Sequence, residues 1–280
     1  MKELVKRSLS GLVYVALIWL ALTSSQAWWW GVALFSVFYF LEADELASLL
    51  KIDKKFFLFL ASVYWLASTA GIVYTFFTGS FRLEWNKYVL LFIALMWLIF
   101  MFLIVFSLIR KNGKTVWGIF YLAVPYTVTL ALLMTEPRLI LFLFVLIWLN
   151  DTFAYLTGKY AGRHKLMPAV SPKKTWEGFF GGLMAVLLAV YILMKIPAVK
   201  GFFYFLQHTD YKDLIILLII IVLLSVAGDL FESWLKRRAG VKDSGNIMPG
   251  HGGILDRLDS YLFAVTGFFV YLFFVFKLFG

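Results

Sequence analysis

The sequence contains no cysteine, which excludes disulfide bonds and thiolate metal sites. Its three histidines, His164, His208 and His251, are far apart in the chain, which argues against a histidine-rich zinc site. Charged residues make up only 15% of the 280 residues, whereas soluble domains hold about a quarter. Hydrophobic residues reach 62%, so the composition predicts a protein that lies almost entirely in a membrane, with no separate soluble domain of ordinary size.

Long apolar runs recur along the whole chain, and each is long enough to cross a bilayer as a helix. The sequence therefore predicts an all-α integral membrane protein with about nine transmembrane helices. The predicted spans are 9–23, 27–48, 56–78, 88–109, 115–134, 138–158, 177–195, 213–234 and 260–278. The first span has features of a signal peptide, but we expect it to be retained because the charge pattern works best with it in place.

Lysine and arginine are distributed unevenly between the two sides of the predicted bundle. Nineteen of the 26 fall on the side of the N-terminus when the nine spans alternate in direction. The positive-inside rule then places the N-terminus in the cytoplasm and the C-terminus outside, in a multi-pass protein of the cell inner membrane. The net charge of +10 is explained by this topology, so we expect no nucleic acid partner.

One polar stretch separates the last two apolar runs and carries most of the candidate chemistry. Asp229, Glu232 and Ser233 are spaced to share one face of a helix, and Asp256 and Asp259 share a face in the same way. Acids at a membrane boundary beside cationic residues suit a divalent metal that carries phosphates. Mg²⁺ typically takes one or two carboxylates and lets substrate phosphates complete its coordination.

The same stretch is rich in glycine around His251. Pro249, Gly250, Gly252 and Gly253 surround this histidine, so the backbone must turn tightly there or approach another group closely. The cationic residues of the stretch are Lys236, Arg237, Arg238, Lys242 and Arg257.

A second basic segment lies between the sixth and seventh predicted spans. Ser171 or Thr175 could cap the seventh helix, and Lys173 and Lys174 stand beside that helix N-terminus. Such an arrangement favours anion binding, although lysines that only set membrane orientation would look the same. Asp151, near the end of the sixth span, is costly in a membrane unless it is paired or faces a wet cavity.

Two further features have structural interpretations. Glu42, Asp44 and Glu45 come near the end of the second span. They could be functional, but we favour the interpretation that they form an ordinary solvated helix end. Gly178 and Gly182 form a G-x-x-x-G pair, which predicts close packing of the seventh helix against a neighbour.

The polar stretch resembles the signature of the phosphatidate cytidylyltransferase family, the CDP-diacylglycerol synthases. The run from Ser171 to Gly178 resembles a second motif of the same family. The positions that carry the first resemblance are Ser233, Lys236, Arg237, Lys242, Asp243, Pro249, His251, Gly252, Gly253, Asp256, Arg257 and Asp259.

The resemblance implies a nucleotidyltransferase that moves a cytidylyl group from CTP to phosphatidic acid. The products would be pyrophosphate and CDP-diacylglycerol for phospholipid biosynthesis. It implies Mg²⁺ as cofactor with room for a second cation, contact with membrane lipid, and a homodimer. Residues 1–135 would form a scaffold with a possible dimer contact, and residues 136–280 the catalytic region. Loops 159–176 and 236–257 would face the cytoplasm.

The resemblance and the charges together suggest individual roles. The expected metal ligands are Asp229, Asp256 and Asp259, with Asp151 and Glu232 as further candidates. The expected catalytic residues are Asp229, Asp256, Lys174, Lys236 and Arg257. The expected substrate-binding residues are Ser171, Lys173, Lys174, Thr175, Ser233, Lys236, Arg237, Lys242, His251, Gly252, Gly253 and Arg257.

Two other functions remain open at this point. A CTP-dependent lipid kinase would share the metal and nucleotide sites but would transfer the γ-phosphoryl group. A cation or phosphate transporter would also place acids in helices. Transporters usually bind their solute at the midplane between inverted repeats, whereas here the polar residues crowd one boundary and no repeat is visible.

The charge distribution generates a direct test of topology. A reporter fused after Gly280 should read as external, whereas reporters inserted in loops 159–176 and 236–257 should both read as cytoplasmic. Accessibility labelling of single cysteines in the two loops checks the same point. Finding the two loops on opposite faces of the membrane would contradict the predicted site, because its two halves could not meet.

Overall fold

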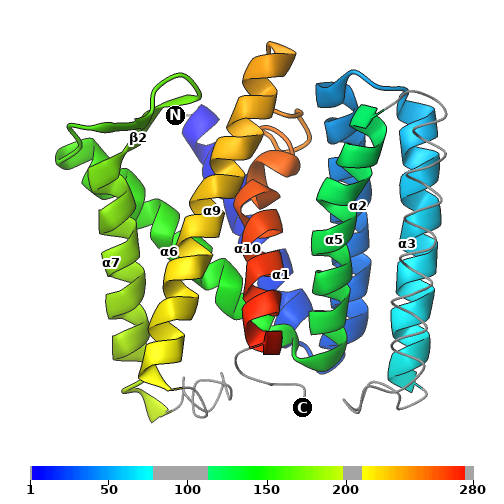
Figure 1. Cartoon of the computed structure of the whole chain (residues 1–280), viewed down its shortest axis with the longest axis horizontal. Helices are drawn as coiled ribbons and strands as arrows, with labels where there is room; N and C mark the ends of the chain where they lie inside the picture. The colour runs from blue at the N-terminus through cyan, green and yellow to red at the C-terminus, as the bar shows by residue number, and fades with distance from the viewer. Residues whose placement is uncertain (1, 78–112, 198–209, 275–280) are drawn as a thin grey trace. The chain divides into compact units, whose positions relative to one another are not determined.

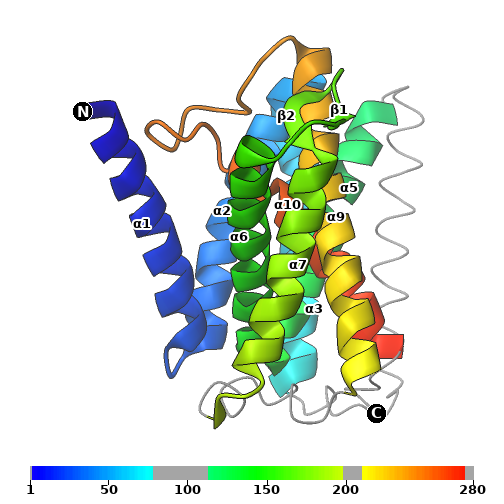
Figure 2. The same cartoon turned by 90° about the vertical axis from the view of Figure 1, so that its left-hand side faces the viewer.

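The computed structural model describes residues 2–77, 113–197 and 210–274, and helices dominate throughout these residues (Figures 1 and 2). The predicted all-α class is confirmed apart from one short hairpin. The predicted span 88–109 and the C-terminus lie outside the described residues. The helices are α1 (Lys2–Thr23), α2 (Ala27–Leu50), α3 (Lys54–Phe77), α5 (Gly113–Thr135), α6 (Pro137–Tyr160), α7 (Trp176–Leu193), α9 (Tyr211–Ala239) and α10 (Leu255–Phe274).

Five of the described helices, α3, α5, α6, α7 and α9, are long and apolar enough to cross a membrane. Within α1, the residues Ser8–Thr23 form a shorter apolar helix. In hydrocarbon a helix satisfies every backbone polar group internally, which explains why apolar runs of this length fold as helices. The protein is therefore a helical, multi-pass membrane protein.

The chain folds as two compact units. The first unit consists mainly of Met1–Pro137 and Asp243–Arg257, and the second of Arg138–Lys242 and Leu258–Phe276. The segment Asp243–Arg257, however, belongs to the same unit as the N-terminal helices.

In the first unit, α2 packs against α1, α3 and α5, and α3 also packs against α5 (Figure 1). Hydrogen bonds between side chains join three of these helices. The Tyr64 hydroxyl lies 2.6 Å from Thr127 Oγ1, and Trp65 Nε1 donates to Ser36 Oγ at 2.9 Å. Between membrane helices such bonds, together with close packing, take the place of a hydrophobic driving force.

In the second unit, glycines allow α7 to lie close to α6. A Cβ atom on Gly178 would stand 2.7 Å from the Ala154 carbonyl oxygen, and one on Gly182 would stand 2.8 Å from the Asn150 carbonyl oxygen. Any larger residue would push the two backbones apart, so the predicted close packing at the G-x-x-x-G pair is confirmed.

The segment between α6 and α7 forms an antiparallel hairpin of β1 (Lys165–Met167) and β2 (Ser171–Thr175), where the sequence predicted only a loop (Figure 2). Thr175 ends β2 and caps α7, since its Oγ1 accepts a hydrogen bond from Gly178 N at 3.1 Å. Of the two predicted caps, Thr175 is therefore the one used. The hairpin also contacts α9, where Arg237 Nε donates to the Val170 carbonyl at 3.4 Å.

Candidate functional site

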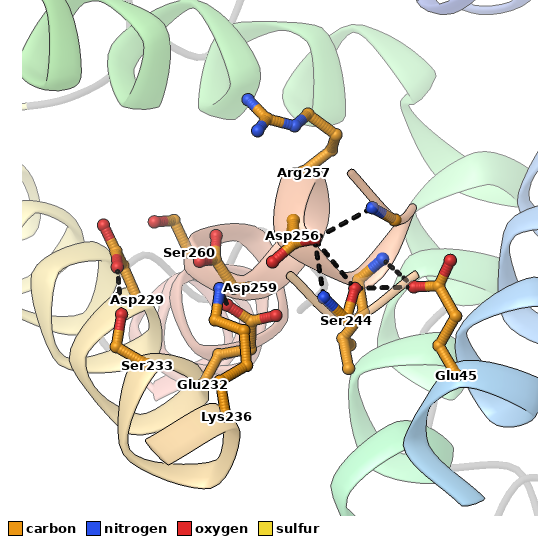
Figure 3. A network of polar contacts seen from close by, with 12 residues as sticks. Glu45, Asp229, Glu232, Ser233, Lys236, Ser244, Asp256, Arg257, Asp259 and Ser260 are labelled. Atoms are coloured by element: carbon orange, nitrogen blue, oxygen red, sulfur yellow. Dashed lines mark hydrogen bonds and ion pairs between the residues drawn. The ribbon is translucent and has the colours of Figure 1, made fainter. Parts of the chain in front are cut away.

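The carboxylate of Asp229, on α9, joins the two polar segments that the sequence singled out. Its Oδ2 lies 2.6 Å from Lys174 Nζ on β2, and its Oδ1 accepts a hydrogen bond from Ser233 Oγ at 3.2 Å (the latter in Figure 3). Both side chains of the ion pair are partly buried, which strengthens their attraction relative to a pair in open water. The hairpin motif and the acidic face of α9 thus meet within the second unit.

One turn further along α9, Glu232 and Lys236 form a second ion pair. Glu232 has no exposed surface, the Lys236 side chain is only 13% exposed, and their charged atoms lie 2.5 Å apart (Figure 3). A buried charge without its partner is strongly destabilising, so each of these residues requires the other. Glu232 thereby holds the Lys236 ammonium in a fixed position.

Asp259, near the start of α10, is a third acid of the second unit and is 9% exposed. Gly228 on α9 lies directly against the Asp259 carbonyl, and a Cβ atom there would also stand 3.2 Å from Ser260 Cα. Burial is the main factor that disfavours the charged form of the Asp259 carboxyl; the charges of Asp229 and Asp151 add to this effect, and the charge of Lys236 opposes it. A buried acid that faces two other acids is the electrostatic environment that a bound cation would relieve.

The donor set fits a cation that also binds substrate. Among the residues that the structure describes, no three His, Asp or Glu side chains gather closely enough to hold a metal by themselves. Mg²⁺ does not require three protein ligands, because it commonly binds through one or two carboxylates and completes its octahedron with phosphate oxygens and water. Asp229 and Asp259 have carboxylate oxygens that could serve as hard ligands of this kind.

In the first unit, Asp256 organises the loop that precedes α10. Its Oδ2 accepts hydrogen bonds from Ser244 N at 2.9 Å, Ser244 Oγ at 3.0 Å and Gly253 N at 2.8 Å (Figure 3). Gly250 and Gly252 have φ angles of 76° and 89°, a region that only glycine adopts readily. These angles confirm the predicted tight turn around His251.

Hydrogen bonds join Arg257 to the backbone of His251, and join both residues to α1. Arg257 Nη2 donates to the His251 carbonyl at 2.8 Å, and Tyr14 Oη donates to the Arg257 carbonyl at 3.3 Å. Ser10 Oγ lies 2.7 Å from His251 Nδ1 and donates to the Pro249 carbonyl at 3.1 Å. The sequence contains no signal for the parts played by Ser10 and Tyr14, because both lie in an apolar run without a motif.

The other predicted substrate-binding residues are mostly accessible. Lys173, Arg237 and Lys242 are exposed, and Ser171 is half-buried on β2. Gly253 is buried in the loop and donates its amide hydrogen to Asp256.

The interpretation of the acids on α2 as a solvated helix end was wrong for two of them. Glu42 and Glu45 are 4% and 3% exposed, whereas Asp44 is at the surface in an ion pair with Lys54. Glu45 is hydrogen-bonded to Ser244 and to the backbone amides of Ile254 and Leu255, where α10 begins. Its partners lie some two hundred residues away in sequence, so no local pattern could have revealed them.

The fold and this arrangement of side chains define a helical membrane protein with acids paired to lysines and a glycine-rich loop held by carboxylates. The chain matches the cytidylyltransferase family over residues 5–275, and it belongs to that family.

Several bacterial relatives share close to half of their aligned residues with this chain. A phosphatidate cytidylyltransferase of Staphylococcus epidermidis is 48% identical over 128 residues, 46% of either chain. Its namesake from Staphylococcus saprophyticus is 48% identical over 130 residues, 45% of either chain. The one from Haemophilus influenzae is 44% identical over 142 residues, 49% of this chain and 46% of that relative. The chain thus matches less than half the length of each of these relatives.

The Lys174–Asp229 pair generates a prediction for nucleotide use. Lys174→Gln should raise the KM for CTP at least tenfold, because a partly buried cation next to a phosphate acts at a lower effective dielectric than a surface charge. Lys165→Gln, an exposed lysine on the neighbouring strand β1, is the matched control. It should change the KM by no more than about twofold, as surface substitutions usually do. If the two substitutions changed the KM for CTP equally, Lys174 would have no special role in CTP binding, and both lysines would serve only to orient the protein in the membrane.

Proposed function

We propose that this protein transfers a cytidylyl group from CTP to phosphatidic acid, giving CDP-diacylglycerol and pyrophosphate, in the cytoplasmic membrane. The observation that carries the proposal is the ion pair of Lys174 with Asp229. This ion pair joins the two segments that carry the sequence motifs. These are the β1–β2 hairpin with its lysines and the face of α9 that carries the acids. Membership of the cytidylyltransferase family and the similarity to phosphatidate cytidylyltransferases of other bacteria support the same reaction.

The reaction needs positioning and charge neutralisation more than covalent chemistry. An oxygen of the lipid phosphate attacks the α-phosphorus of CTP, the bond to the β-phosphate oxygen breaks, and pyrophosphate leaves with the bonding electrons. Both reactants are anions, so Lys174, Lys236 and Arg257 would lower their mutual repulsion and hold the phosphates in line. Arginine adds a two-pronged contact to phosphate. The attacking phosphate is ionised near neutral pH and needs no strong base.

For the metal, we propose Asp229, Asp256 and Asp259 as ligands, with Asp151 as a further candidate. When bound, Mg²⁺ would place positive charge on the phosphate oxygens and on the leaving pyrophosphate. The mutual repulsion of Asp229 and Asp259 supports their assignment, and Asp256 stands three residues before Asp259 on the same helix. Glu232 is better suited to holding Lys236, because that ion pair is buried.

The topology and assembly of the proposed enzyme follow from the charge distribution and the family resemblance. We propose about nine spans, a cytoplasmic N-terminus, an external C-terminus and a site that faces the cytoplasm, where CTP is found. We also propose a homodimer, with residues 1–135 as the candidate contact.

An apolar groove in the first unit supports a lipid substrate. Its cavity of about 560 Å³ lies between α1 and the loop before α10, with Val13, Leu17 and Phe38 among its lining residues. Lys6 also lines it and gives it a cationic side chain. An adjoining cavity of about 440 Å³ between α1 and α2 shares Leu17. We propose that this groove holds an acyl chain of phosphatidic acid while a cationic residue faces the lipid phosphate.

Filling the groove should therefore discriminate between lipids by chain length. Val13→Trp should raise the KM for dioleoyl phosphatidic acid severalfold and leave the KM for a dioctanoyl analogue and for CTP unchanged, because only a long chain needs the space. Leu12→Trp, on the same helix but not among the lining residues, is the control and should leave all three constants unchanged. If Val13→Trp and Leu12→Trp had the same KM for dioleoyl phosphatidic acid, the groove would not be the binding site of the acyl chain.

Product analysis tests the reaction itself. Purified protein supplied with CTP and phosphatidic acid should form CDP-diacylglycerol and pyrophosphate in equal amounts, and chelation of Mg²⁺ should abolish both. A lipid kinase would release CDP and transfer the γ-phosphoryl group instead, and a transporter would move solute into vesicles without forming either product. Labelling CTP at the α- and γ-phosphates separates these outcomes by following which phosphorus enters the lipid.

A further inference from the structure

The buried carboxylate of Glu45 is the feature that the proposed function leaves unused. Both of its oxygens accept hydrogen bonds from the segment that the sequence identified as the signature. Ser244 Oγ donates to Oε2 at 2.8 Å, Ile254 N donates to Oε1 at 3.0 Å and Leu255 N donates to Oε2 at 2.9 Å (the Ser244 contact is drawn in Figure 3). Glu45 thus contacts the loop and the first residue of α10, Leu255, and these residues all belong to the first unit.

The two amides show why α10 needs this residue. The first backbone N–H groups of a helix have no partner inside the helix, and a side-chain oxygen usually caps them. α10 begins at Leu255, and the residue before it, Ile254, has no polar side chain for this purpose. Glu45 supplies the missing acceptor from α2. Its negative charge also complements the positive end of the α10 dipole.

The third donor couples Glu45 to Asp256. Ser244 Oγ lies 2.8 Å from Glu45 Oε2 and 3.0 Å from Asp256 Oδ2, so one hydroxyl bridges the two carboxylates. Ser244 N and Gly253 N also bond to Asp256 Oδ2. A displacement of the Glu45 carboxylate would therefore be transmitted to Asp256 through Ser244.

Two glycines of the loop are explained by the same carboxylate. A Cβ atom on Gly245 would stand 2.5 Å from Glu45 Oε1, and one on Gly253 would stand 2.5 Å from the Glu45 carboxyl carbon. The Glu45 side chain is 3% exposed, so it cannot move aside into solvent. The loop packs so closely around Glu45 that positions 245 and 253 have no room for a side chain.

We propose that Glu45 is a positioning residue that sets the orientation of Asp256 and the first turn of α10. It acts through Ser244 and the amides of residues 254 and 255 and does not itself touch substrate. The consequence for turnover rests on the proposed function, whereas the effect on the loop does not. Residues that orient a metal-binding carboxylate typically change metal affinity or activity by about 10–100-fold when replaced.

The test compares Glu45→Gln with Asp44→Asn. Glutamine keeps the shape of Glu45 but turns one acceptor into an N–H donor that faces other donors, so at least one loop bond is lost. We expect kcat to fall about 10–100-fold and the Mg²⁺ concentration for half-maximal activity to rise by a similar factor. Asp44→Asn removes the same charge from the adjacent, solvent-facing position and should change both quantities by less than about twofold.

Hydrogen exchange provides a readout that does not depend on activity. In Glu45→Gln, the amides of residues 253–256 should exchange at least tenfold faster, while those of the α2–α3 core keep wild-type rates. Ser244→Ala removes only the bridge between the carboxylates, so it should raise the Mg²⁺ requirement without exposing the amides of residues 254 and 255. If Glu45→Gln fails to fold, Ser244→Ala decides the proposal by its Mg²⁺ requirement, or by the exchange of residue 253 if no activity is found.

The proposal would be overturned if the amides of residues 253–256 in Glu45→Gln exchanged hydrogen at the wild-type rate. It would also be overturned if Glu45→Gln and Ser244→Ala both needed the same Mg²⁺ concentration as the wild type. The failure of the proposed function looks different. In that case the wild-type protein forms no CDP-diacylglycerol, yet the exchange difference between Glu45→Gln and Asp44→Asn still reports whether Glu45 holds the loop.

Discussion

A carboxylate buried in a membrane protein must be surrounded by donors or cations, and this constraint shapes both units of the molecule. Glu45 is enclosed by a hydroxyl and two helix amides, and Asp256 by a hydroxyl and two loop amides. Asp229 and Glu232 are instead paired with lysines. The polypeptide is folded so that each of these four acids, two of them buried and two half-buried, has compensating partners.

The kind of partner distinguishes the acids by what they can do. Carboxylates held by backbone amides are locked into the local fold, because a lost bond leaves an unsatisfied amide in a buried place. Glu45 and the bonded oxygen of Asp256 belong to this kind. A carboxylate paired with a lysine can exchange that partner for a metal ion, while the lysine turns to a phosphate. The Lys174–Asp229 pair has the two charges that such an exchange requires.

Glycine is the second requirement, because carboxylates and backbones can approach only where no side chain stands between them. Gly178 and Gly182 bring α7 onto α6, and Gly228 brings α9 against the backbone of Asp259. Gly245 and Gly253 make the same kind of room around Glu45. The glycines therefore serve the polar sites as much as they serve helix packing.

Local patterns in the sequence were sufficient to predict the features that depend on neighbouring residues. Apolar runs specified most of the helices, the G-x-x-x-G spacing specified the contact of α7, and Thr175 stood where a helix cap was needed, because each depends on residues within a few turns. Family membership could also be inferred, because the motifs are contiguous.

The pairing of each cation with an acid, and the burial of particular acids, became evident from the packing of distant segments. The sequence suggested that Glu45 is a surface residue, but in the structure it is hydrogen-bonded to Ser244, which lies 199 positions later in the chain. Ser10 likewise contacts His251, which is 241 positions away. The sequence also contained no indication of the hairpin that places Lys174 beside Asp229. Such contacts arise when distant segments pack and exclude water, and the free energy of satisfying a buried charge then selects the partner, which no local pattern encodes.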